Sequence, residues 1–181
     1  TPVKTASVNI ADFKNSFDAA KELVQKLPQQ DLVSILIFSD GSLVNGSELV
    51  KGLNAATANK ILITGGLAGD GAEFKSTLVG LNSQPVEGCI AAVGFYGNKI
   101  TVTHGSQGGW DSFGPERTVT KSTGNVLFEI DSKHALDLYK KYLGPDVENL
   151  PGSALLFPLA ATLPGSSQAV SRTILSIDNN A

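Results

Sequence analysis

Apolar residues near the start of the chain recur at steps of three and four, the spacing of one face of an α-helix. They are Phe13, Phe17, Ala20, Val24 and Leu27, and Pro28 marks the expected end of this helix. Residues 32–38 then form a nearly continuous run of apolar and β-branched residues, which ends at Ser39-Asp40-Gly41-Ser42. Such a run is typical of a strand that is buried on both faces.

A second helix and a second strand follow. Leu49, Val50 and Leu53 predict the inner face of a helix over residues 46–56, and the run at 60–63 predicts a strand. Residues 31–64 therefore form a strand–helix–strand unit with parallel strands. Because the two strands end at the same edge of the sheet, Ser39-Asp40-Gly41 is expected beside the glycine-rich segment that follows the second strand. Ligands bind at this place in open α/β sheets.

The pattern then changes to short β-like runs joined by Gly, Asn and Pro, at residues 76–81, 88–96 and 99–104. Gly97-Asn98 predicts a hairpin between the last two runs. A second hairpin is expected from residues 118–121 and 125–130, around Ser122-Thr123-Gly124. Together with the first unit, these runs predict an α+β (mixed α/β) fold. It consists of an N-terminal strand–helix–strand unit followed by an antiparallel β meander with flanking helices.

One further helix is expected near the end of the chain. Its apolar positions are Ala135, Leu138, Tyr139 and Tyr142, with Asp131 or Ser132 as the N-cap and Gly144-Pro145 as the stop signal. An irregular connection over residues 151–169 and a strand-like run over 170–177 complete the chain.

Composition narrows the class of partner. The chain has 181 residues, a net charge of −3 and no block of Lys or Arg, which argues against nucleic acid and anionic membranes. Its apolar runs are too short to span a bilayer. Cys89 cannot form an internal disulfide, and with His104 and His134 it supplies too few ligands for a structural zinc site. The chain starts with Thr1-Pro2 and has no Met, so we expect a fragment or a processed form of a longer protein.

Two glycine-rich segments are the candidate ligand contacts. Residues 65–71 hold four glycines, Gly65, Gly66, Gly69 and Gly71, together with the charged Asp70. So many glycines after a strand favour backbone amides that face a small molecule, although a purely structural loop also explains them. The second segment runs from His104 and Gly105 through Gln107 to Trp110. A histidine there can act as a base or bind a metal or haem iron, or it can simply stabilise a turn.

The sequence also bears on nucleotide binding, a cysteine nucleophile and a catalytic pair of carboxylates. The glycine spacing matches neither a dinucleotide fingerprint nor a phosphate-binding loop. Cys89 lies in an apolar run, which favours a buried and inert thiol over a nucleophile. Asp40 and Asp70, at the ends of neighbouring strands, resemble the acid and base of a glycosidase, but turns and helix caps also explain them.

The order of motifs along most of the chain resembles the FIST domain. These motifs are Gly65-Gly66-Leu67-Ala68-Gly69-Asp70, Phe74, the run at 89–96, Ser106-Gln107-Gly108, Phe113-Gly114-Pro115, Val119-Thr120-Lys121, Gly124-Asn125 and Glu129-Ile130-Asp131. Ala135-Leu136, Tyr139, Tyr142-Leu143-Gly144 and Leu156-Phe157-Pro158-Leu159 extend the resemblance. The chain departs from the family at Ser132-Lys133-His134, where Gly-x-Pro is common. The resemblance implies an N-terminal FIST domain over residues 1–144 and the beginning of the C-terminal FIST region, cut short, over 145–181.

The resemblance also implies a function. FIST domains are regarded as intracellular sensory modules of bacterial signalling proteins, in some cases beside kinase or cyclic-dinucleotide output domains, with small ligands such as amino acids as the proposed cargo. We therefore expect a cytoplasmic, non-catalytic domain that binds a small ligand. The backbone amides of residues 65–71 and 105–109 would receive its polar or anionic group. The expected contacts are Asp40, Gly65, Gly66, Gly69, Asp70, Gly71, His104, Gly105, Gln107, Trp110 and Phe113.

Within this set Asp70 would bind a ligand amine, and Trp110 and Phe113 would form apolar walls. No cofactor is expected. Two alternatives stay open. One is a hydrolase that uses Asp40, Asp70 or His104. The other is a haem-based gas sensor with His104 as axial ligand, by analogy with a haem-binding subset of the family.

Overall fold

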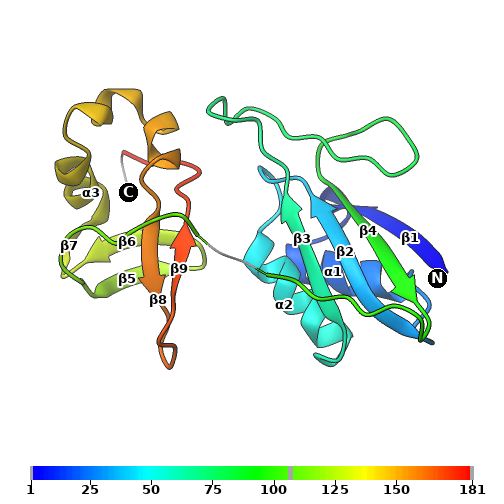
Figure 1. Cartoon of the computed structure of the whole chain (residues 1–181). Helices are drawn as coiled ribbons and strands as arrows, with labels where there is room; N and C mark the ends of the chain where they lie inside the picture. Colours follow the sequence, from blue (N-terminus) through cyan, green and yellow to red (C-terminus); the bar gives the residue numbers. More distant parts are fainter. Residues whose placement is uncertain (1, 106–107, 180–181) are drawn as a thin grey trace. The chain divides into compact units, whose positions relative to one another are not determined.

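The computed structural model describes residues 2–105 and 108–179. The chain divides into two compact units, Thr1–Ser106 and Gln107–Ala181, which are described separately below (Figure 1). Among the described residues, no helix has the length and apolar character needed to cross a membrane.

The first unit contains a four-stranded sheet of order β1-β4-β2-β3. Its strands are β1 (Val3–Asn9), β2 (Leu32–Ser39), β3 (Leu62–Leu67) and β4 (Cys89–Tyr96). As expected, β2 and β3 are parallel, whereas β4 runs antiparallel to both β2 and β1. Helices α1 (Ser16–Gln25) and α2 (Gly46–Ala56) cover one face of this sheet, and a short 3-10 helix, η1 (Ile10–Asp12), precedes α1 (Figure 1). The predicted strand–helix–strand unit is confirmed.

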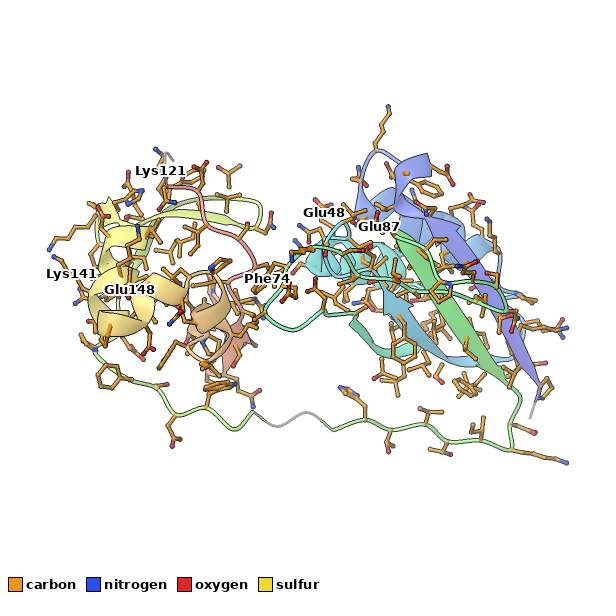
Figure 2. All side chains as sticks on the ribbon, turned by 90° about the horizontal axis from the view of Figure 1, so that it is seen from above. Glu48, Phe74, Glu87, Lys121, Lys141 and Glu148 are labelled. Carbon is orange, nitrogen blue, oxygen red and sulfur yellow. The ribbon has the colours of Figure 1, made fainter. Side chains whose placement is uncertain are left out.

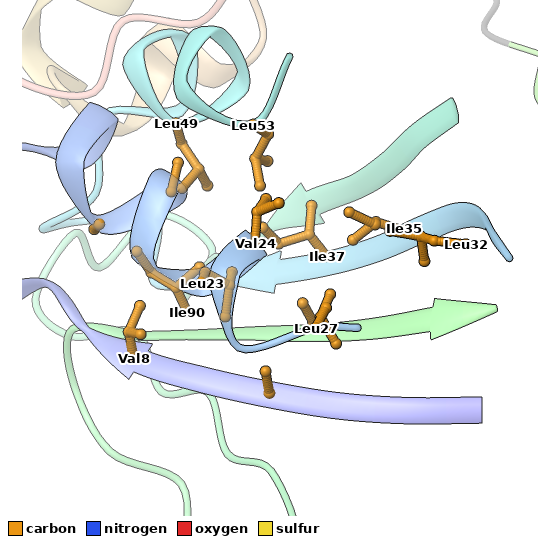
Figure 3. Packing of buried hydrophobic residues seen from close by; sticks show 14 of the residues in the cluster. Val8, Leu23, Val24, Leu27, Leu32, Ile35, Ile37, Leu49, Leu53 and Ile90 are labelled. Carbon is orange, nitrogen blue, oxygen red and sulfur yellow. The ribbon is translucent and has the colours of Figure 1, made fainter. Parts of the chain in front are cut away.

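The hydrophobic core of the first unit lies between this sheet and the two helices (Figure 3). Its fully buried side chains include Leu23, Leu27, Ile35, Leu53 and Ile90. The helical spacing of apolar residues in α1 and α2 and the apolar runs of β2 and β4 supply this layer. We call the face of the sheet that contacts the helices the first face and the opposite one the second face.

Several expectations for the first unit were wrong. Strand β1 was not predicted, and Gly65 and Gly66 belong to β3 instead of the loop after it. Residues 99–104 form no strand, and the hairpin at Gly97-Asn98 is absent. The reason is that β1 and β2 already pair with the two edges of β4, so β4 has no free edge for a hairpin partner. Residues 76–81 contribute only one bridge, from Val79 to Val86.

The second unit has two small sheets. Strands β5 (Val119–Thr123), β6 (Val126–Ile130) and β7 (Lys133–His134) form one, and β8 (Leu159–Thr162) pairs with β9 (Ala169–Arg172) in the other. The remaining elements are α3 (Ala135–Leu143), η2 (Gly144–Asn149) and η3 (Gly152–Leu155). The hairpin of β5 and β6 is confirmed. With the mixed sheet of the first unit, these elements confirm the α+β fold.

The ends of the elements in the second unit differ from the prediction in three places. Helix α3 begins after His134 without a side-chain cap, so neither Asp131 nor Ser132 is its N-cap. Its end at Gly144, where φ is +57°, agrees with the stop signal. The run at 170–177 is a strand only as far as Arg172, and β8 lies within the segment that was expected to be irregular.

Candidate functional site

The carboxyl ends of β2 and β3 lie side by side, as the sequence predicted. The amide of Ala68 donates to the carbonyl of Ser39 over 2.8 Å. At Gly41 the two segments approach so closely that a Cβ atom would lie 2.1 Å from the carbonyl oxygen of Ala68. Glycine is required at this position because any side chain would collide with backbone.

Asp40 holds this end of the sheet together. Its buried carboxylate accepts hydrogen bonds from the amides of Ser42 at 2.7 Å, Leu43 at 2.8 Å and Gly88 at 2.8 Å. The Thr77 hydroxyl donates to it as well, and Thr77 Oγ1 accepts from the amide of Gly41 at 2.9 Å. Burial raises the pKa of Asp40, but these hydrogen bonds outweigh it and hold the pKa below its ordinary value. This geometry gives Asp40 a structural role.

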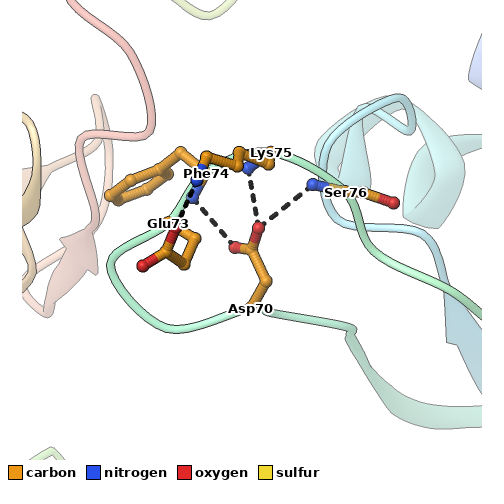
Figure 4. Close-up of polar contacts among 5 residues, drawn as sticks. All are labelled: Asp70, Glu73, Phe74, Lys75 and Ser76. Carbon is orange, nitrogen blue, oxygen red and sulfur yellow. Dashed lines mark hydrogen bonds and ion pairs between the residues drawn. The ribbon is translucent and has the colours of Figure 1, made fainter.

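Asp70 closes a loop of its own (Figure 4). One carboxylate oxygen accepts from the amide of Phe74 at 3.2 Å, and the other accepts from Lys75 at 2.7 Å and Ser76 at 3.1 Å. The bonds from Lys75 and Ser76 are the main cause of a lowered pKa at Asp70. The side chain is not fully buried. Its carboxylate can therefore accept a further hydrogen bond from a group that approaches through solvent.

The glycines of residues 65–71 have different roles. A Cβ at Gly65 would lie 1.8 Å from the carbonyl oxygen of Ile37, and φ there is +152°, so this glycine is needed for strand packing. At Gly66, Gly69 and Gly71 no described atom outside the glycine and its two chain neighbours lies within 4 Å of the position of a Cβ. The backbone at these three positions is open to a molecule that approaches it.

Phe38 is a candidate site residue that the sequence reasoning missed. Ile37 belongs to the core on the first face, so Phe38 belongs to the second face, where its side chain is 50% exposed. Its neighbours across the sheet are Gly66 on β3 and Ala91 on β4, both small. The sequence signal that could have identified Phe38 is a large aromatic residue at the last position of a strand that faces away from the core. The phenyl ring offers an accessible apolar surface beside the open backbone of Gly66.

The second face around Phe38 carries no charged side chain. By strand register its residues are Val3, Thr5, Ser7 and Asn9 of β1, Ser34, Leu36 and Phe38 of β2, Leu62, Thr64 and Gly66 of β3, and Cys89, Ala91, Val93 and Phe95 of β4. A sheet face that only contacts water usually alternates with charged and polar residues. Ser34, Cys89 and Ala91 on this face are buried, so the chain itself covers part of it, whereas Phe38 stays half-exposed.

The other predicted site residues are not in this group. His104 and Gly105 are exposed and lie in a stretch without secondary structure, and Gln107 lies outside the described residues. Trp110 and Phe113 belong to the second unit, where they are 55% and 87% exposed. The structure therefore groups Asp40 with the glycines of residues 65–71.

The ring of Phe113 meets the ring of Tyr142 edge-on, with 6.1 Å between centroids. Tyr142 also accepts a hydrogen bond from Arg117, and Arg117 forms an ion pair with Asp131 at 2.9 Å. A backbone hydrogen bond from Thr118 and the contact with Arg117 hold the pKa of Asp131 below its ordinary value. These contacts connect the start of the second unit to β6 and α3.

The geometry offers no support for the hydrolase alternative. Among the described residues, no hydrogen bond or ion pair joins Asp40, Asp70 and His104 to one another. Cys89 is buried, and burial together with the negative charge of Asp40 raises the pKa of its thiol, which agrees with an inert cysteine. No cluster of three His, Cys, Asp or Glu side chains suited to a metal ion occurs in the part of the chain that the structure describes.

Comparisons with known proteins identify the family. A family model for the FIST N domain matches residues 1–133, which include all of the first unit and both glycine-rich segments. Neither a curated protein nor a solved structure matches the chain. The model covers well over half of the 181 residues. The chain therefore belongs to the FIST N domain family, whose members are sensory domains and not enzymes.

Proposed function

We propose that this chain is the receptor part of a small-molecule sensor and that the ligand binds where β2 and β3 end. The observation that carries this proposal is the half-exposed ring of Phe38 between the small residues Gly66 and Ala91. An accessible aromatic ring on an uncharged sheet face has no evident role in packing. Together with nearby backbone groups it is typical of a site that binds a ligand with both apolar and polar parts.

The polar groups near this edge favour a ligand that carries both charges. The open backbone at Gly69 and Gly71 can donate to an anionic group. Helix α2 also begins at this edge, where Gly46 packs against Leu67 of β3, and its N-terminal end favours a negative charge. The partly exposed carboxylate of Asp70 is suited to an amine. A free amino acid carries both an ammonium and a carboxylate group and is the ligand class we propose.

Ligand binding would act on the segment between β3 and β4, residues 68–88. This segment contributes Asp70 and the open glycines, and it is attached to the sheet through Asp40, which binds Gly88 and Thr77. A ligand changes the output of a sensor only when it binds two states with different affinity. We propose that occupancy shifts the position of residues 68–88, and that a kinase or cyclic-dinucleotide output domain in the cytoplasm reads this shift.

A thermal-shift screen of the purified chain against the common amino acids, small carboxylates and haemin tests the proposal. A ligand that binds the folded state alone raises the apparent Tm as its concentration increases. We expect a shift with at least one amino acid and its loss in Gly66→Leu, which places a large side chain beside Phe38. Haemin that binds with a Soret band and loses it in His104→Ala would favour the haem alternative.

Phe157→Ala is the matched control for Phe38→Ala, because Phe157 is a phenylalanine of similar exposure, 45%, in the second unit. We expect Phe38→Ala to abolish the ligand-induced shift and Phe157→Ala to keep it. A shift that survives both Phe38→Ala and Gly66→Leu would show that the ligand binds elsewhere.

A further inference from the structure

The free edge of β3 lacks a partner strand. In the sheet order β1-β4-β2-β3, the last strand pairs with β2 only. The amide of Ala68 points toward β2, where it binds Ser39, so the alternation of a parallel ladder turns Ile63, Gly65 and Leu67 outward. The strand from Leu62 to Leu67 has no charged residue and no proline, the usual features that prevent an edge strand from pairing.

The segment after β4 also lacks backbone partners. We call residues 98–105 the connecting segment. Among the described residues, no hydrogen bond or ion pair involves any residue of this segment. Ile100 and Val102 are half-buried and alternate with exposed Lys99, Thr101 and Thr103. This alternation of β-branched residues is the signature of a strand, yet the segment is not part of any sheet.

The connecting segment starts at the end of the sheet where β3 begins. Strand β4 is antiparallel to β2 and β2 is parallel to β3, so β4 ends where β3 begins. From there the connecting segment passes in front of the second face of the sheet, toward the side of β3 (Figures 1 and 2). Three inter-strand spacings of about 4.8 Å separate β4 from a strand added beyond β3. The five steps from Tyr96, the last residue of β4, to Thr101 cover that distance at about 3.4 Å each.

We propose that residues 101–104 of the connecting segment, which are unpaired in this structure, pair in parallel with the outward edge of β3 in a second conformation of the chain and form a fifth strand of the sheet. Residues 97–100 make the crossing. Since alternate residues of a parallel strand face one neighbour, the pairing gives partners to the two outward amides of Ile63 and Gly65 and to part of the unbonded backbone of the segment. It also moves His104 to the glycine-rich end of β3. The pairing itself does not depend on the proposed ligand.

Amide hydrogen exchange of the whole chain, followed by NMR, tests this proposal residue by residue. With β3 at the free edge, the inward amides of Thr64 and Gly66 are protected, whereas the outward amides of Ile63 and Gly65 exchange freely. Pairing protects both sets. We expect the outward amides to exchange more than about tenfold more slowly than the open amide of Gly69.

The double variant Val102→Pro/Thr103→Pro removes two neighbouring donors, one of which must face β3 in any register. We expect it to release the outward amides of β3 and leave those of Thr64 and Gly66 protected, which also shows that the unit is folded. Val102→Ala/Thr103→Ala keeps both donors and is the matched control. Outward amides that exchange as fast as Gly69 in the unaltered chain would overturn the proposal. So would protection that rises with protein concentration and survives the double proline variant, because a second copy of the chain would then be the partner.

Discussion

At the scale of single residues, the neighbouring glycines of β3 have opposite requirements. Gly65 has no space for a side chain, because a Cβ would lie 1.8 Å from the carbonyl oxygen of Ile37 and φ is +152°. Gly66 has open space at the same position. We expect Gly65→Ala to lower the free energy of unfolding by about 2 kcal/mol or more, through overpacking and backbone strain.

Gly66→Ala provides the comparison, with an expected change within about 0.5 kcal/mol. Urea unfolding of both variants, followed by circular dichroism, measures the difference. Equal losses of stability in the two variants would contradict the close approach of β2 and β3 at Gly65.

Asp40 is the second residue whose environment decides its role. Asp40→Ala leaves the amides of Ser42, Leu43 and Gly88 without their acceptor, and the bond from Gly88 is buried, so we expect a loss of about 3 kcal/mol or more in the free energy of unfolding. Asp70→Ala is the matched control, since the amides that bind Asp70 can bind water instead. Its loss of stability, measured in the same urea titration, should be the smaller of the two.

The lowered pKa of Asp40 also predicts a dependence on pH. A carboxyl group whose pKa is lower in the folded than in the unfolded state contributes its full stability above the unfolded value, about 3.9. That contribution is lost as the pH falls from about 4 through the lower pKa of the folded state. Between pH 6 and pH 2, the unaltered chain should lose more stability than Asp40→Asn. Parallel curves for the two proteins would show that Asp40 makes no such contribution.

At the scale of elements, a glycine sets the distance between the two helices of the first unit. Gly52 of α2 faces α1, where an added Cβ would lie 2.5 Å from the carbonyl oxygen of Phe17 and 2.7 Å from the side chain of Ala20. Helix propensity favours alanine over glycine by about 1 kcal/mol. We expect the steric effect to dominate, so that Gly52→Ala lowers the Tm although it improves the helix.

Ala55→Gly at an exposed position of the same helix is the reference for propensity alone, with an expected loss of about 1 kcal/mol. Differential scanning calorimetry on both variants gives the comparison. A higher Tm for Gly52→Ala would mean that α1 and α2 can move apart without a loss of stability.

At the scale of the whole molecule, the two units differ in how much core they contain. The core cluster of Ala6, Leu23, Ile35, Leu53, Ile90 and their neighbours lies in the first unit. Among the described residues of the second unit, the buried hydrophobic side chains are Ala135, Leu143 and Ala154. Burial of apolar surface is the main favourable term in folding, so the first unit should fold without the second.

A fragment of residues 1–105 should therefore unfold cooperatively, with dispersed NMR signals, whereas a fragment of residues 107–181 should not. Thermal unfolding and heteronuclear spectra of the two fragments check this expectation. A cooperative transition of the second fragment by itself would show that its small sheets and α3 are sufficient for a stable fold.

The family could be identified from the sequence, because the order of the glycine-rich motifs along the chain can be recognised without knowing which residues are in contact. The predicted domain boundary at residue 144 stays a prediction. The family match ends at residue 133, and the boundary between the two compact units falls between residues 106 and 107. The expected kinase or cyclic-dinucleotide partner and the cytoplasmic location belong to the proposed function.

The sequence by itself determined those elements whose signals are local. The 3.6-residue spacing of apolar positions specified α1, α2 and α3, a continuous apolar run specified β2, and Gly144 ended the last helix. The sequence also predicted that Asp40 and the glycines after β3 would be neighbours, because parallel strands end at a common edge.

The tertiary structure alone decided which strands pair and which groups remain accessible. Strand β1 takes the edge of β4 that the predicted hairpin would have used, since strand pairing is a competition between distant segments. In the folded chain the buried carboxylate of Asp40 accepts hydrogen bonds from backbone amides, among them that of Gly88, and the ring of Phe38 stays half-exposed. Local sequence carries no information about such contacts, because burial and hydrogen bonding depend on residues that come together only when the chain folds.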